Sequence, residues 1–188
     1  MMPPAPALLT LNEPPRLSPV MAKVILHWGE MGARWGVNRS VAQVHALLWL
    51  AGRPLAAEDI AETLSIARSN VSTSLDELQA YRLVTLVHVI GDRRNRYQAR
   101  TDPWDIVRTI IDERKKREID PTLEVLRAAS ASAEGDEATP ADVKKRMAEM
   151  ANFIARMTGW YDQMKNVPRP MLERMIKLGA RIVRLLGK

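Results

Sequence analysis

The sequence contains no cysteine, which excludes disulfide frameworks, thiolate metal sites and cysteine nucleophiles. It also contains no long apolar run. The N-terminal apolar stretch from Ala5 to Leu11 is too short to span a bilayer, and it lacks the preceding basic region of a secretory signal. We therefore expect a cytoplasmic protein in a reducing compartment. The remaining composition, with 46% apolar and 27% charged residues, is typical of a chain that folds around its own core.

Motifs for catalysis or cofactor binding are missing as well. The three histidines do not have the spacing of metal ligands, and the sequence has neither a glycine-rich phosphate loop nor a nucleophile elbow. Glu58, Asp59 and Glu62 form an acidic cluster, which we interpret as the first turn and outer face of a short helix. We expect no enzyme activity, no metal site and no cofactor.

Positive charge is concentrated at one end of the chain. The 28 Lys and Arg residues exceed the 22 Asp and Glu residues, which gives a net charge of +6 over 188 residues. Residues 165–188 hold seven basic side chains and a single acidic one, Glu173, so this tail accounts for the whole excess. A high isoelectric point that arises from a tail is weak support for nucleic-acid binding.

Proline content and periodicity divide the chain into three parts. Residues 1–19 hold six of the twelve prolines and are predicted to form an irregular arm. Residues 20–102 are predicted to form a winged helix-turn-helix domain, and residues 103–188 a helical dimerisation region. The fold class expected is therefore mainly α, with a two-stranded wing.

The domain assignment for residues 20–102 follows from the order of its elements. Apolar residues at helical spacing predict helices over residues 25–35, 41–51, 57–64 and 68–81, with Gly52 ending the second and a short strand at Leu55. Apolar and β-branched residues then alternate from Val84 to Ile90, which indicates a strand. A turn at Gly91-Asp92 leads to a partner strand over residues 97–101.

The start of the fourth predicted helix carries the candidate DNA-reading side chains. Such a helix needs small polar residues at its solvent-facing N-terminal positions, because these reach base edges in the major groove. The residues that fit this requirement are Arg68, Ser69, Asn70, Ser72 and Thr73. Backbone N–H groups at the helix start, together with Arg68, can bind a phosphate. The alternative interpretation is that these residues only cap and solubilise a surface helix.

The predicted wing is rich in arginine. Arg93, Arg94 and Arg96 lie at its tip beside Asp92, and an arginine-rich wing suits contact with phosphate or with a narrow minor groove. The alternative is a solvated turn whose charges serve solubility. We expect Asp92 to pair with a neighbouring arginine and to hold the wing rather than to face phosphate.

These segments resemble the GbsR/MarR-like transcriptional regulators. "SNVSTSLDELQAYRLV" (Ser69 to Val84) is similar to the recognition helix of that family, "VHVIGDRRNRYQA" (Val87 to Ala99) to its wing, and "DPWDIVRTIIDERKKREIDPTLEVL" (Asp102 to Leu126) to the segment that follows. The resemblance implies a dimeric DNA-binding protein that controls transcription, in some members in response to a small solute. By position, Arg68, Asn70 and Ser72 match the DNA-facing helix start of the family, and Arg93, Arg94 and Arg96 match its wing.

The C-terminal part is predicted to form helices that need a partner. A proline at position 121 predicts a kink or a fresh helix start capped by Asp120, and Thr139-Pro140 predicts the start of another helix, with Thr139 as its N-cap. The latter helix carries a heptad seam of apolar residues at positions 143, 147, 150, 154, 157, 161 and 164. The last helix, from about Met171, has a wide apolar face and basic residues on its other sides. We favour dimer packing for it over membrane docking, although the pattern is compatible with both.

We therefore predict a homodimer that binds double-stranded operator DNA and represses transcription by steric competition with polymerase. A small-molecule effector that shifts the spacing of the two recognition helices would relieve the repression. Five tryptophans could cage a quaternary ammonium solute, but their helical spacing favours core packing. The alternative function is a protein-interaction module whose basic C-terminal helix docks on a membrane or an acidic partner.

Overall fold

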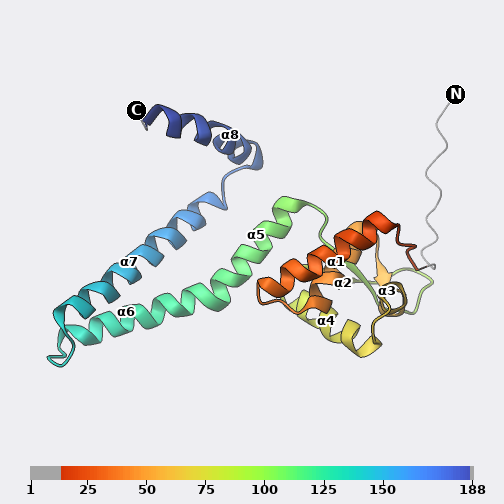
Figure 1. The fold of residues 1–188 in the computed structure, drawn as a ribbon, viewed down its shortest axis with the longest axis horizontal. Coiled ribbons are helices and arrows are strands. Elements are labelled where there is room, and N and C mark those ends of the chain that lie inside the picture. Colours follow the sequence, from red (N-terminus) through yellow and green to blue (C-terminus); the bar gives the residue numbers. More distant parts are fainter. Residues whose placement is uncertain (1–13, 187–188) are drawn as a thin grey trace. The chain divides into compact units, whose positions relative to one another are not determined.

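The computed structural model describes residues 14–186 and their side chains up to residue 179, and it is drawn in Figure 1. The chain divides into two compact units after Ile110. This division lies inside a helix, whereas the sequence predicted a boundary between residues 102 and 103. Most of the predicted arm lies outside the described residues, and its last residue, Pro19, is the first residue of a helix.

Four helices form most of the first unit, and their predicted positions are confirmed. Their bounds are Pro19–Arg34 for α1, Arg39–Ala51 for α2, Ala57–Leu64 for α3 and Arg68–Ala80 for α4. Local chemistry sets the ends: the Ser18 side chain accepts a hydrogen bond from the Met21 N–H at 3.2 Å and so caps α1. Gly52 ends α2 with φ of 61°, a left-handed conformation that glycine adopts without steric cost.

A small antiparallel sheet completes the first unit. Its strands are Leu55–Ala56 (β1), Val84–Val87 (β2) and Arg96–Ala99 (β3), in the order β1-β3-β2. Val84 pairs with Ala99 and Val87 with Arg96, so β2 is three residues shorter than the alternating pattern predicted. Residues 88–95 form the wing loop instead, with Gly91 at φ of 85°. Ile90 lies in this loop and is fully exposed, so its apolar side chain does not mark a buried strand position.

The core of the first unit lies where the helices meet the sheet. Its fully buried side chains come from α2 (Val44, Leu47, Leu48), β1 (Leu55), α3 (Ile60) and α4 (Val71, Leu75). Burying an aliphatic side chain contributes roughly 1.5–3 kcal/mol, so the α4 pair anchors that helix firmly. Trp28 and Trp49 stack with ring centroids 6.1 Å apart and pack against this core. These two tryptophans therefore serve packing rather than an aromatic cage.

The second unit is helical throughout its described part. Its elements are the end of α5 (Pro103–Arg114), the π-helix η1 (Lys115–Ile119), α6 (Asp120–Glu134), α7 (Ala141–Met164) and α8 (Arg169–Leu186). α6 and α7 pack against each other as a helical hairpin (Figure 1). Pro121 does not break the chain of helices: because it lacks an N–H group, the preceding turn widens into η1 and α6 begins at Asp120. The Lys115 ammonium bonds the Asp120 carboxylate at 2.9 Å across that turn.

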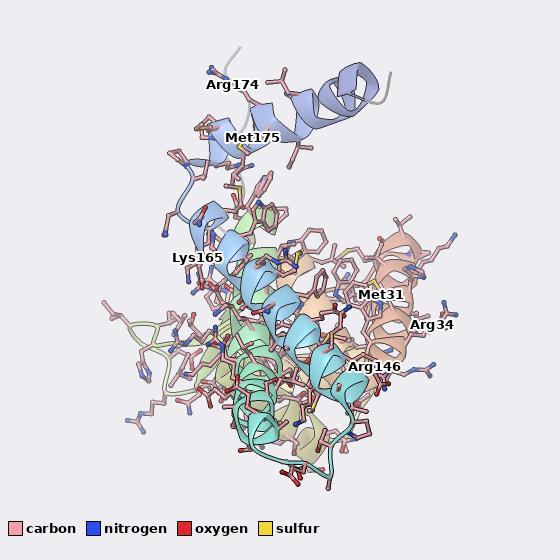
Figure 2. All side chains as sticks on the ribbon, turned by 90° about the vertical axis from the view of Figure 1, so that its left-hand side faces the viewer. Met31, Arg34, Arg146, Lys165, Arg174 and Met175 are labelled. Carbon is pink, nitrogen blue, oxygen red and sulfur yellow. The ribbon has the colours of Figure 1, made fainter. Side chains whose placement is uncertain are left out.

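The start of α7 differs from the prediction by one residue. Pro140 occupies the N-cap position, and the Thr139 hydroxyl donates to the Asp136 carboxylate in the preceding loop rather than capping the helix. Figure 2 shows Arg146 and Lys165 toward opposite ends of α7. Among the described residues, no helix combines the length and the apolar character needed to cross a bilayer.

The predicted heptad seam of α7 is split between two faces. Ala151 is buried, and the Tyr161 hydroxyl donates to the Asp112 carboxylate at 3.1 Å, which fixes one face of α7 within the unit. The neighbouring face carries four half-exposed apolar residues, which we call the α7 stripe: Met150 (52% exposed), Phe153 (54%), Met157 (49%) and Trp160 (57%). Their spacing of three, four and three residues places them on one side of the helix.

Candidate nucleic-acid interface

The start of α4 presents a polar surface on a firmly packed helix. Val71, Ser74, Leu75 and Leu78 are buried and set the orientation of α4 on the core. The five predicted residues are all exposed: Arg68, Ser69, Asn70, Ser72 and Thr73. The side chain at the N-cap is that of Ala67, which makes no capping hydrogen bond. The N–H groups of the first turn therefore receive no side-chain acceptor from the N-cap residue and can bind an anion.

Two of these residues already have polar contacts. The Thr73 hydroxyl donates to the Ser69 carbonyl at 3.1 Å, so it is satisfied within the helix. The Arg68 guanidinium forms an ion pair with the Glu58 carboxylate of α3, and both side chains are largely open to solvent, at 72% and 43% exposed. An exposed ion pair of this kind is weak and can exchange its acceptor.

Asp92 organises the wing loop. Its Oδ1 accepts from the Arg94 N–H at 3.0 Å and from Arg94 Nε at 3.2 Å, and its Oδ2 accepts from Arg96 Nε at 2.7 Å. These bonds, chiefly the one from the Arg94 side chain, hold the pKa of the Asp92 carboxyl well below its usual range. Asp92 in turn raises the pKa of Arg94. The expectation that Asp92 pairs with neighbouring arginines is confirmed by these contacts.

A second carboxylate, Asp59 of α3, joins the wing to the helical core. It is buried, accepts from the Ala56 N–H at 3.3 Å and accepts from Arg94 Nη1 at 3.4 Å. Arg96 Nη1 lies 3.9 Å from the same carboxylate. Asp59 therefore connects the first turn of α3 to both arginines that Asp92 binds.

The prediction that Arg96 contacts DNA is corrected by this geometry. Its side chain is 0% exposed, lies at the start of β3 and forms an ion pair with Asp92 at 2.5 Å. A guanidinium enclosed between two carboxylates holds the wing to the core and does not reach a phosphate. Arg94 is 37% exposed and also bonds both carboxylates, whereas Arg93 lies exposed beside them in the loop.

Sequence reasoning missed the roles of Glu58 and Asp59. The sequence predicts for them only the outer face and first turn of a short helix, yet Asp59 is buried and Glu58 pairs with Arg68 of α4. One local signal was available for Asp59, because an acidic residue three positions after the N-cap can accept a hydrogen bond from the N-cap N–H. The contacts to Arg94 and Arg96 join segments 35 or more residues apart and have no local signature.

In the part of the chain that the structure describes, no three His, Asp or Glu side chains are arranged so that they could hold a metal ion. His45 of α2 is buried, and burial lowers its pKa from 6.5 to about 4, so the imidazole is neutral at physiological pH. Its Nε2 atom lacks a hydrogen-bond partner. This histidine belongs to the core of the first unit.

Comparisons with known proteins agree with this geometry. A family model described as "MarR family" matches residues 33–95, which run from the end of α1 to the wing loop. No curated protein matches the chain. A solved structure of a transcriptional regulator is 18% identical with a TM-score of 0.53, and the alignment covers 77% of this chain and 99% of that chain.

Two further solved structures are less similar in shape. A point mutant of MepR from S. aureus, solved bound to an oligodeoxyribonucleotide, is 14% identical over 73% of this chain and 92% of its own, with a TM-score of 0.37. The regulator Tm0710 from Thermotoga maritima is 14% identical over 79% of this chain and 94% of its own, with a TM-score of 0.37. At these identities the likeness concerns the fold alone. With the element order, the small sheet and the family match in agreement, the first unit of this chain is a MarR-like winged helix-turn-helix.

Proposed function

We propose that the protein is a sequence-specific DNA-binding regulator of transcription. The observation that carries this proposal is the start of α4, where a helix anchored by buried residues presents Arg68, Ser69, Asn70 and Ser72 to solvent. Small polar side chains at these positions fit the major groove and read base edges, while the first-turn N–H groups and Arg68 bind the backbone. The match of residues 33–95 to the MarR family supports the same assignment.

The wing contributes contacts of a different kind. Arg93 lies exposed in the loop, and Arg94 is partly exposed beside it, so both suit the phosphate backbone or a narrow minor groove. The buried Arg96 pairs with Asp92 and Asp59 and so holds the loop that carries them. In this proposal α4 supplies sequence discrimination and the wing supplies affinity.

We further propose that the protein acts as a homodimer, with the second unit forming the interface. A two-fold operator needs two reading heads roughly 34 Å apart, and the described residues of one chain form a single winged helix-turn-helix. The α7 stripe is an apolar surface of the kind that a second copy would cover. Bound to an operator, the dimer would exclude polymerase and repress, and a small molecule that altered the spacing of the heads would relieve repression.

The test is binding to a fluorescent duplex taken from the DNA upstream of the protein's own gene. The titration is repeated at several salt concentrations and with unrelated duplex as competitor. We expect tight binding that survives the competitor, and Arg68→Ala and Arg93→Ala should each weaken it and reduce the salt dependence by about one phosphate contact. Lys145→Ala, on an exposed position of α7, is the matched control. If binding to the upstream duplex and to the unrelated duplex is lost equally as salt rises, the protein is not a sequence-specific regulator.

A second candidate function rests on α8. Its apolar residues Met171, Met175, Ile176 and Leu178 are 42–65% exposed, and the basic Arg174 and Lys177 lie on the same helix; Figure 2 shows Arg174 and Met175 projecting from it. A helix of this composition fits an anionic surface such as an acidic membrane. Sedimentation with anionic but not with neutral vesicles would support this function, and no sedimentation with either would reject it.

A further inference from the structure

Glu58 places a negative charge on the face that the proposed function turns toward DNA. It lies in the first turn of α3, 43% exposed, and its carboxylate pairs with the guanidinium of Arg68 at the start of α4. It is also one of the acids that raise the pKa of Arg94 in the wing. Unlike its buried neighbour Asp59, which binds the backbone and the wing, Glu58 points its charge at the proposed phosphate-binding arginine.

A carboxylate and a phosphate compete for the same guanidinium. Arg68 can bind a DNA phosphate with its full charge only after it leaves Glu58, and the freed Glu58 carboxylate then lies close to a polyanion. Both effects oppose backbone binding, and neither depends on the base sequence. They therefore weaken binding to every duplex, including those on which α4 makes no favourable base contact.

We infer that Glu58 competes with DNA phosphate for Arg68 and thereby lowers the affinity of the protein for DNA of any sequence. This inference rests on the proposed function. On unrelated DNA, Arg68 stays with Glu58 and contributes little to affinity. On the operator, base contacts from Ser69, Asn70 and Ser72 hold α4 in the major groove, and Arg68 exchanges Glu58 for a phosphate. The exchange costs the energy of the ion pair, so Glu58 lowers the affinity for the operator at least as much as the affinity for unrelated DNA.

Other roles for Glu58 give different results. If it only stabilises the first turn of α3 through the helix dipole, its neutralisation changes stability and not DNA binding. If it orients Arg68 for the phosphate, its neutralisation weakens DNA binding. Competition for Arg68 makes the neutral variant bind unrelated DNA more tightly, and by more than removal of the same charge elsewhere on α3 does.

The experiment compares E58Q with E62Q, because Glu62 lies exposed one turn further along α3 and carries the same charge. Each variant is made in the wild-type chain and in an R68A chain, and binding to an unrelated duplex is titrated at several salt concentrations. We expect E58Q to bind this duplex about threefold to tenfold more tightly than E62Q, with a salt slope steeper by about 0.9. In the R68A chain, the difference between E58Q and E62Q should shrink, because only the repulsion between Glu58 and the phosphates is left. Affinity for the operator should rise at least as much, because Arg68 leaves Glu58 in that complex.

Several results would overturn the inference. These are equal binding of E58Q and E62Q in the wild-type chain, weaker binding of E58Q, or a gain of the same size in the R68A chain. Thermal melting checks the fold of each variant, and E58A, with the same expected direction, is measured alongside E58Q. Failure of the proposed function is separately visible, because wild-type protein would then show no preference for the operator over the unrelated duplex.

Discussion

Asp92 is the residue on which the shape of the wing depends. β2 ends at Val87 and β3 begins at Arg96, so strand pairing does not extend into the loop between them. In place of strand pairing, the Asp92 carboxylate accepts hydrogen bonds from both Arg94 and Arg96. Asp59 connects the same arginines to α3. Arg93 is thus presented from a loop whose conformation is set by charge.

Removal of Arg93 and removal of Arg96 should therefore have different effects on stability and on DNA binding. We expect Arg96→Ala to lower the melting temperature by roughly 10 °C, because it leaves two carboxylates without their buried partner. Arg93→Ala should leave the melting temperature unchanged and weaken DNA binding. Thermal melting and duplex titration on the same samples separate these outcomes. A stable Arg96→Ala protein that binds DNA poorly would mean that Arg96 contacts DNA after all.

Charge runs in a sequence do not distinguish these roles. Arg93, Arg94 and Arg96 lie within four positions and have the same chemistry, so composition predicts one role for all three. Pairing with Asp92 was predictable because that carboxylate is adjacent. Burial of Arg96 was not, since it depends on Asp59, 37 positions away in sequence, and on the Pro54 carbonyl, which Arg96 Nη1 reaches at 3.5 Å.

A buried histidine should make the stability of the first unit depend on pH. The folded-state pKa of His45 is about 4, below its ordinary value of 6.5, so between these values the unfolded chain binds a proton that the folded chain does not. Stability should therefore fall as pH drops from about 6.5 to about 4, by up to about 3 kcal/mol, and change no further through this group below that range. Denaturant unfolding at a series of pH values measures the slope.

The variants His45→Leu and His27→Leu isolate this effect. His45→Leu removes the buried titrating group and should flatten the loss of stability between pH 6.5 and 4. His27 is exposed on α1, so His27→Leu should retain the wild-type dependence. If both variants lose stability with pH as steeply as the wild type, the acid sensitivity arises from other groups.

Helix positions were the most predictable feature at the scale of elements. Apolar spacing located α1 to α4, because each of these helices buries one face against the core. Prediction was weaker at helix ends, where one hydrogen bond decides the outcome. Thr139 has a side chain typical of an N-cap residue, but its hydroxyl donates a hydrogen bond to Asp136, and Pro140 is the N-cap residue. Pro121 was expected to kink a helix or to begin one capped by Asp120; α6 does begin at Asp120, but its N-cap is Ile119 and it follows the π turn η1 directly.

Close packing of α1 on α2 depends on a glycine. A Cβ atom at Gly32 would lie 2.6 Å from the Cβ of Ala42, closer than such atoms approach, so the two helices would have to separate. We expect Gly32→Ala to destabilise the protein by about 1–3 kcal/mol. The control is Gly159→Ala in α7, where a Cβ meets no atom within 4 Å; it should stabilise by about 0.5–1 kcal/mol. Chemical denaturation compares them, and a neutral Gly32→Ala would mean that α1 and α2 are less tightly packed.

At the scale of the whole molecule, local and non-local information differ in what they predict. The winged helix-turn-helix is built from short-range elements, and its order was readable from periodicity and turn residues. The heptad seam of α7 was also readable, but its division into a packed face and the exposed α7 stripe was not. A repeat of apolar residues indicates that a helix needs partners, and it does not say which partner covers which side.

If the α7 stripe is the dimer interface, a charge placed on it should separate the copies. Phe153 lies within the stripe, and we expect Phe153→Glu to raise the dimer dissociation constant about 100-fold, because two carboxylates would be buried without partners. Asn152→Glu adds the same charge at the next exposed position, roughly 100° away around the helix, and should leave the dimer intact. Analytical ultracentrifugation over a concentration series gives both constants. Binding of Phe153→Glu to a two-half-site operator should weaken in parallel, since a monomer engages only one half-site. Should Phe153→Glu sediment as the wild type does, the stripe faces solvent in the dimer and another surface joins the copies.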